Sequence, residues 1–139
     1  MKKYFIDSNI FLRILTADNE KMLLECVKLI EMIKHGQVKV VTSNFVAAEI
    51  VWTLGSTYKF DRLKISDAVK VIINMPNLKV DDTCDTVRAL ELYSSSSVKY
   101  IDALIASNPE IQSKKMIVVS YDKDFDKLGV KRLEPKDLL

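Results

Sequence analysis

The sequence of 139 residues has few of the side chains from which small zinc or disulfide frameworks are built. It contains two cysteines, Cys26 and Cys84, which lie far apart, and one histidine, His35. Zinc sites need several such ligands at close spacing, so this set excludes the usual zinc frameworks. We expect both cysteines to be buried free thiols of a protein in a reducing cytoplasm.

Glycine and proline are also scarce, with three of each, which argues against a disordered or fibrous chain. No apolar run approaches the roughly 20 residues that a membrane-spanning helix needs. The N-terminus passes from Lys2 and Lys3 directly into a strand-like segment, without the apolar core of a signal peptide. With 48% hydrophobic and 29% charged residues, the chain is expected to be a soluble cytoplasmic protein with one domain over residues 1–139.

An excess of charge of one sign is missing as well. The 21 lysines and arginines nearly balance the 19 aspartates and glutamates, which gives a formal net charge of +2. The overall charge therefore gives no strong reason to expect a polyanionic partner. Any contact with a nucleic acid must come from a local patch of basic residues.

The chain does show an alternation of short apolar segments with segments of helical periodicity. Strands are expected at residues 4–6, 38–41, 78–80 and 116–119. Helices are expected after the turn at 7–9, after a cap at Asp18 or Asn19 to about 35, at 44–57, after a cap at Ser66 to about 74, at 83–93 after Asp81 and Asp82, and at 101–107. The continuously apolar strands predict an α/β fold, with a parallel sheet covered by helices on both sides.

Four acidic residues interrupt or end stretches that otherwise resemble buried core. Asp7 follows the first strand, Glu49 and Asp102 lie inside apolar helices, and Asp122 follows the last strand. Glu49 shares its helix face with the apolar side chains of Phe45, Ala48 and Trp52. Buried carboxylates are costly unless a cation neutralises them, and magnesium prefers such oxygen ligands. Bound divalent ions at this set would support phosphodiester hydrolysis without a side-chain nucleophile.

Each acid alone also has a purely structural explanation. Asp7 can be a helix N-cap, and Glu49 can form a salt bridge with a nearby lysine or arginine. Asp102 can be a first-turn aspartate that the helix dipole stabilises. Asp122 can be a turn or capping residue, and Asp124 and Asp126 are weaker candidates of the same kind. The argument for a metal site therefore rests on the four acids together.

Four short motifs carry a family resemblance over essentially the whole chain. They are residues 5–9 (FIDSN), 47–50 (AAEI), 100–106 (YIDALIA) and 119–125 (VSYDKDF). In this order and spacing the chain resembles PIN-domain ribonucleases, most closely the small VapC-type toxins of toxin–antitoxin pairs. Ser8 stands where threonine is commoner, and it keeps the hydroxyl.

The resemblance implies a single PIN domain over residues 1–139 with a three-layer α/β/α fold and a central parallel sheet. It implies an endoribonuclease dependent on Mg²⁺ or Mn²⁺, a homodimer and a small antitoxin partner. The implied catalytic and metal-binding residues are Asp7, Glu49, Asp102 and Asp122, supported by Ser8, Asn9, Ser120 and Asp124. Asp7 and Asp102 would hold the principal metal, and Glu49 would act through water or as a proton acceptor.

Residues near the expected rim could hold RNA, although ordinary surface roles remain open for all of them. They are Arg13, Lys59, Arg62, Lys64, Lys99 and Lys123, with Tyr58 and Phe60 as stacking candidates. Three other functions also remain open. One is a non-catalytic PIN-like module that binds RNA or a protein, and another is an RNA-processing nuclease that is not a toxin. The third, an aspartate-nucleophile phosphatase, would need a second aspartate where this chain has Asn9.

Overall fold

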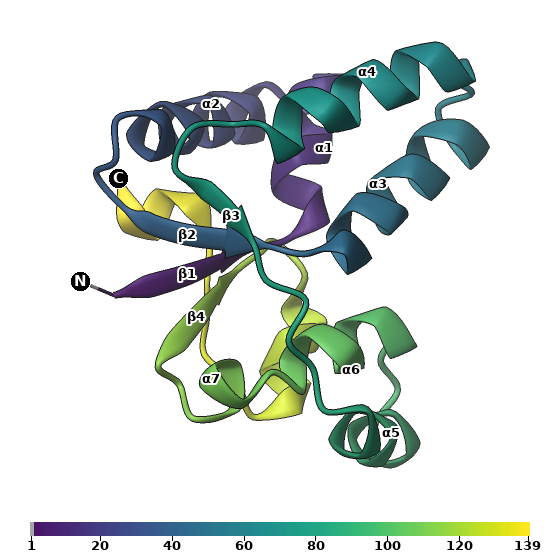
Figure 1. Cartoon of the computed structure of the whole chain (residues 1–139), viewed down its shortest axis with the longest axis vertical. Helices are drawn as coiled ribbons and strands as arrows, with labels where there is room; N and C mark the ends of the chain where they lie inside the picture. Colours follow the sequence, from purple (N-terminus) through teal and green to yellow (C-terminus); the bar gives the residue numbers. More distant parts are fainter. Residues whose placement is uncertain (1) are drawn as a thin grey trace.

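The computed structural model describes residues 2–139 and contains a five-stranded sheet in which every strand pair is parallel (Figure 1). The strand order is β3-β2-β1-β4-β5, so the first strand of the chain lies at the centre of the sheet. The strands are β1 (Lys3–Ile6), β2 (Lys39–Thr42), β3 (Leu78–Val80), β4 (Met116–Val119) and β5 (Arg132–Leu133). Phe5 is in register with Val41 of β2 on one side and with Val118 of β4 on the other.

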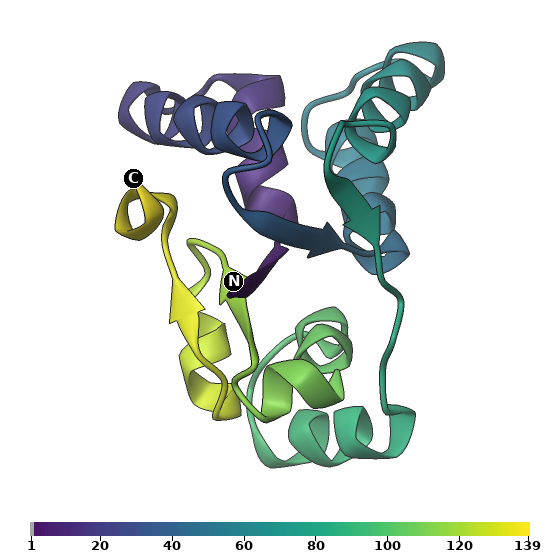
Figure 2. The same cartoon turned by 60° about the vertical axis from the view of Figure 1, so that its left-hand side comes forward.

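Helices cover both faces of this sheet. They are α1 (Ser8–Thr16), α2 (Glu20–Lys34), α3 (Asn44–Ser56), α4 (Arg62–Ile73), α5 (Thr86–Ser95), α6 (Tyr100–Ala106), α7 (Pro109–Gln112) and the 3-10 helices η1 (Lys123–Leu128) and η2 (Pro135–Leu138). Figure 2 shows α1 to α4 on one side of the sheet and α5 to α7 on the other. The predicted three-layer α/β fold is therefore confirmed.

Local capping explains where the first helices begin. The Asp7 carboxylate accepts a hydrogen bond from the Ser8 amide at the start of α1. Asn19 caps α2 through the Met22 amide, and Ser43 caps α3 through the Val46 amide. These short polar side chains satisfy amide groups that have no partner inside the helix. The predicted strand-to-helix junctions after residues 6 and 42 are confirmed.

Two predicted helix starts are wrong, because in each case an aspartate that was not predicted is the cap. Helix α4 begins at Arg62 because Asp61 accepts a hydrogen bond of 2.8 Å from the Lys64 amide, so Ser66 lies inside the helix. Helix α5 begins at Thr86 after the cap Asp85. Asp81, expected to begin that helix, instead accepts a hydrogen bond from the Thr83 amide in a turn. Strand β5 was not predicted, because two residues are too few to show a periodicity.

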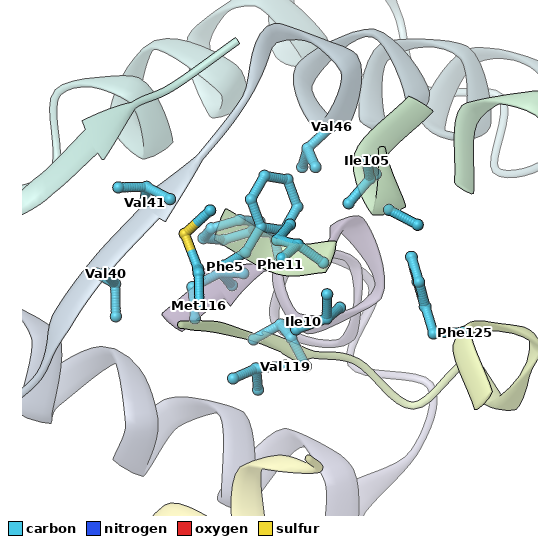
Figure 3. Close-up of a cluster of buried hydrophobic side chains, with 14 of the residues drawn as sticks. Phe5, Ile10, Phe11, Val40, Val41, Val46, Ile105, Met116, Val119 and Phe125 are labelled. Atoms are coloured by element: carbon cyan, nitrogen blue, oxygen red, sulfur yellow. The ribbon is translucent and has the colours of Figure 1, made fainter. Parts of the chain in front are cut away.

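The core lies between the sheet and its two helix layers. Figure 3 shows Phe5 at its centre, with Phe11 from α1, Val46 from α3, Ile105 from α6 and Phe125 from η1 around it. Cys26 and Cys84 are free thiols, as expected, but only Cys26 is buried, and Cys84 is half-buried. Within residues 2–139, no helix is both long enough and apolar enough to cross a membrane.

Two leucines of α2 provide a matched test of this core. Leu29 is fully buried, whereas Leu24 is 58% exposed. We expect Leu29→Ala to lower the free energy of unfolding by about 2–5 kcal/mol, because it leaves a cavity. Leu24→Ala should change that free energy by less than about 0.5 kcal/mol. Urea denaturation of both variants measures the difference, and equal losses would contradict the packing described here.

Candidate functional site

The sheet brings the first and last of the four predicted acids to one edge. Strands β1 and β4 are neighbours, and Ile6 is in register with Val119 at their carboxyl ends. Asp7 therefore follows β1 close to the point where Ser120 to Asp122 follow β4. Because the strands are parallel, both segments leave the sheet in the same direction. The predicted convergence of Asp7 and Asp122 at this edge is present in the structure.

Asp7 is 2% exposed and is held by several hydrogen bonds. Its carboxylate accepts from the Ser120 hydroxyl at 2.6 Å, from the Ser8 amide at 2.8 Å and from the Asn9 side-chain amide at 3.3 Å. Burial raises the pKa of Asp7 to about 6, and the charge of Glu49 adds to this rise, while the bond from Ser120 opposes it. Asp7 is thus both the helix cap that its sequence permits and a member of the site.

Ser120 and Asn9 join the two strand ends. The Ser120 hydroxyl donates to Asp7 and accepts from the Asn9 side-chain amide at 2.9 Å and from the Asp122 amide at 3.0 Å. These bonds use its one donor and both its acceptor positions. The Asn9 side-chain oxygen accepts from the Tyr121 amide at 3.1 Å. Two of the four residues expected to be supporting, Asn9 and Ser120, therefore hold the Asp7 carboxylate and tie it to the backbone that follows β4.

Asp102 is the site acid with the most strongly raised pKa. It lies in the first turn of α6, is 1% exposed, and its Oδ2 atom is buried with no hydrogen-bond partner among the described residues. Burial raises its pKa to about 8, and the negative charges of Asp7, Asp122 and Glu49 contribute further. The other three predicted acids therefore lie within electrostatic reach of Asp102. A buried ionised carboxylate with a free oxygen is costly unless a cation binds it.

Asp102, Asp122 and Asp124 form a compact cluster of oxygen donors. Each offers one carboxylate oxygen, and these three oxygens lie within 4.8 Å of one another. Asp122 also caps η1 by accepting from the Asp124 amide at 2.9 Å, so its structural explanation holds as well. The sequence ranked Asp124 only as a supporting residue, yet it belongs to this cluster. Hard divalent cations such as Mg²⁺ take carboxylate oxygens as ligands, so the donor set fits one.

Glu49 reaches the site from α3. Its Oε2 atom is 2.9 Å from the ammonium of Lys99, and its Oε1 atom accepts a hydrogen bond from the Ser8 hydroxyl. The salt bridge that the sequence left open is therefore formed, and it is formed inside the acidic site. The expectation that Trp52 shares a buried face with Glu49 is wrong, because Trp52 is 70% exposed while the Glu49 side chain is 15% exposed.

The two aromatic residues expected at the rim make structural contacts. Tyr58 and Phe60 form an edge-to-face pair with ring centroids 6.4 Å apart, and Tyr58 donates a hydrogen bond to Asp18. These contacts show both aromatic rings anchoring the connection between α3 and α4.

Sequence reasoning missed Arg132, which donates to the Ser120 carbonyl at 2.9 Å and ties β5 to the site. No local motif marks that residue, because its partners are distant in the chain.

The raised pKa of Asp102 predicts a pH-dependent stability. Its pKa is about 8 in the folded protein against 3.8 ordinarily, so the fold holds this proton more tightly than the unfolded chain does. Stability from Asp102 is therefore complete below the lower value and is lost as pH rises through the higher one. In metal-free buffer, the melting temperature of Asp102→Asn minus that of wild type should increase from about pH 4 to about pH 8. For Asp67→Asn, an exposed control on α4, this difference should stay constant. A flat difference for Asp102→Asn would refute the assignment.

Comparison with known proteins identifies the family of the chain. A sequence model described as PIN domain matches residues 4–131. The VapC ribonuclease of Aquifex aeolicus (strain VF5) is 29% identical over 133 residues, which cover 94% of this chain and 95% of that protein. Two solved structures share the fold: VapBC2 from Rickettsia felis bound to a DNA fragment from their promoter, and VapBC-1 from nontypeable Haemophilus influenzae.

The Rickettsia structure has a TM-score of 0.69 at 15% identity, and the match covers 95% of this chain and 98% of that one. The Haemophilus structure has a TM-score of 0.66 at 14% identity, and the match covers 96% of this chain and 98% of that one. At such identities the likeness concerns the fold. The sequence match over residues 4–131 identifies the family, and the chain belongs to the PIN domain family.

Proposed function

We propose that this protein is a VapC-type toxin, a metal-dependent endoribonuclease that hydrolyses phosphodiester bonds in RNA. The observation that carries this proposal is Asp102, a carboxylate with 1% exposure that has an unpartnered oxygen and belongs to a cluster of three acids. The similarity to a VapC ribonuclease over nearly the full length of both chains supports the activity and the RNA substrate. RNA would be met in the cytoplasm, and the whole chain would act as one PIN domain.

The acids would divide the work according to their surroundings. Asp102, Asp122 and Asp124 would hold a divalent ion, with the buried Asp7 adding negative charge beside them. Mg²⁺ is the expected ion and Mn²⁺ the alternative, because both accept carboxylate oxygens. When bound, the ion supplies charge neutralisation at the phosphodiester and makes water a better nucleophile. Glu49, nearer to solvent, would accept a proton from that water. Ser8, Asn9 and Ser120 would keep the carboxylates in place.

The same residues make the non-catalytic alternative less favourable. A module that only binds RNA has no need to keep four mutually repelling carboxylates in one site. A processing nuclease with the same chemistry would differ from a toxin only in its partner and target. The structural likeness to VapBC complexes supports a small antitoxin as that partner.

Apolar side chains at the surface are consistent with protein partners. Helix α5 exposes Val87, Leu90 and Tyr93 at a spacing of three residues. We propose that this face joins two copies of the chain.

A separate groove of about 530 Å³ lies between α1, α2 and α4. Its apolar lining, which includes Phe11, Ile14 and Val71, would suit an apolar segment of the antitoxin.

Substitution of a site acid tests the activity. We expect Asp7→Asn and Asp102→Asn each to lower the rate of cleavage of a mixed single-stranded RNA pool by more than about 100-fold. Even residues that merely orient a metal ligand are worth about 10–100-fold. Cleavage should require Mg²⁺ or Mn²⁺ and stop with EDTA, while Asp67→Asn keeps the wild-type rate. Circular dichroism confirms that each variant is folded. Full activity in either site variant would exclude this site, and no cleavage by wild type would favour the binding module.

A matched pair of leucines tests the homodimer. Leu90 of α5 is 51% exposed and Leu24 of α2 is 58% exposed. We expect Leu90→Glu to convert the dimer to a monomer of 15.9 kDa, because a charge buried in an apolar interface is costly. Leu24→Glu should leave the dimer intact. Size-exclusion chromatography with light scattering measures both masses. A monomeric wild type, or a dimeric Leu90→Glu variant, would rule out this interface.

A further inference from the structure

The ion pair between Lys99 and Glu49 connects two helices on opposite sides of the sheet. Lys99 immediately precedes α6, and its ammonium is 2.9 Å from Glu49 of α3, so the contact crosses the space between the two helix layers. The carboxylates of Asp102, Glu49 and Asp122 all act on this ammonium. Lys99 is therefore a cation inside the field of the acidic site and more than a rim residue.

The contacts divide the site acids into two groups. Asp102, Asp122 and Asp124 each have a carboxylate oxygen close to those of the other two. The Asp124 Oδ1 atom is also 3.1 Å from the Lys127 ammonium. Glu49 lies outside this compact group, and both of its oxygens already have partners, the Lys99 ammonium and the Ser8 hydroxyl. The first group lacks a positive charge at its centre, as the orphaned Oδ2 atom of Asp102 shows. The Glu49 side already has its positive charge.

Nucleases that use two metal ions place them about 3.5–4 Å apart, one for the attacking oxygen and one for the leaving oxygen. Of the two site acids outside that compact group, Asp7 is 2% exposed and both of its oxygens already accept hydrogen bonds. A second ion here would therefore need Glu49 as a ligand. It would then have to displace the Lys99 ammonium or lie against it. Two cations at such a distance repel each other strongly where water is partly excluded.

We propose that Lys99 is the second cation of this active site, so that the protein binds one divalent ion and uses the ammonium where a second ion would otherwise bind. This inference rests on the proposed metal-dependent function. An ammonium has three N–H donors, and only one is directed at Glu49. The Lys99 side chain is 59% exposed, so its remaining donors are open to a phosphate oxygen of RNA. Lys99 would thus hold Glu49 and neutralise phosphate charge at the same time.

A surface salt bridge is the ordinary explanation of such a contact, and it predicts a different outcome. If Lys99 only links α3 to α6, its removal leaves the number of bound metal ions unchanged. If it occupies the second cation position, its removal opens Glu49 to a second ion. The number of ions bound per chain therefore separates the two explanations without any measurement of activity.

The test counts Mn²⁺ ions per chain in the absence of RNA, from the electron paramagnetic resonance signal of free Mn²⁺ during titration of the metal-free protein. Wild type should bind one ion, and Lys99→Met should bind two. Lys99→Arg keeps the charge and should bind one. Lys123→Met is the matched control, because it removes a lysine between Asp122 and Asp124 that forms no ion pair among the described residues. It should also bind one ion.

Cleavage of RNA gives a second readout. The wild-type rate should depend on Mn²⁺ as for one bound ion. Lys99→Met should lose at least 10-fold in rate at low Mn²⁺, and should recover it at high Mn²⁺ with the concentration dependence of two ions.

Two ions bound to wild type, or one ion bound to folded Lys99→Met, would overturn the role of Lys99 and leave the nuclease proposal intact. No Mn²⁺ bound to wild type would overturn both.

Discussion

The structure depends on the cost of placing several carboxylates in one poorly hydrated site. Asp102 and Asp7 are nearly inaccessible to solvent, and their raised pKa values reflect first their burial and then the like charges around them. Such a cluster opposes folding unless protons, hydrogen bonds or cations offset it. Each feature around the site supplies one of these. Ser120 and Asn9 supply hydrogen bonds to Asp7, Lys99 supplies a cation to Glu49, and the Asp102 cluster offers the carboxylate oxygens that the proposed metal ion would bind.

The parallel sheet makes this concentration of charge possible. The centre of the sheet holds β1 and β4, two short strands that both end in buried apolar residues, so that polar residues begin at the same level on both strands. Arg132 of β5 bonds the Ser120 carbonyl and also pairs with Asp126 and Glu134, which fixes the strand end from the outer side. Rigid strands with a hydrogen-bonded second layer are the kind of support that a preorganised site requires.

The helix layers provide the remaining functions. One layer brings Glu49 on α3, and the other brings Asp102 on α6, so the site lies where the two layers approach at the edge of the sheet. Both layers also expose apolar side chains, including Trp52 on α3 and Leu90 on α5. Surfaces of this kind are suited to protein partners.

The sequence alone determined the fold class and most of the elements, and it singled out four acids as site candidates. Those signals are local, because apolar strands, capping residues and carboxylates inside apolar stretches can be recognised within a few positions. It could not place Asp61 and Asp85 as caps, since several nearby polar residues could serve as well. Only the tertiary structure decided that Asp124 joins Asp102 and Asp122, that Lys99 binds Glu49, and that Trp52 faces outward. Those facts depend on how distant segments meet across the sheet, where packing and charge act between residues that no local pattern connects.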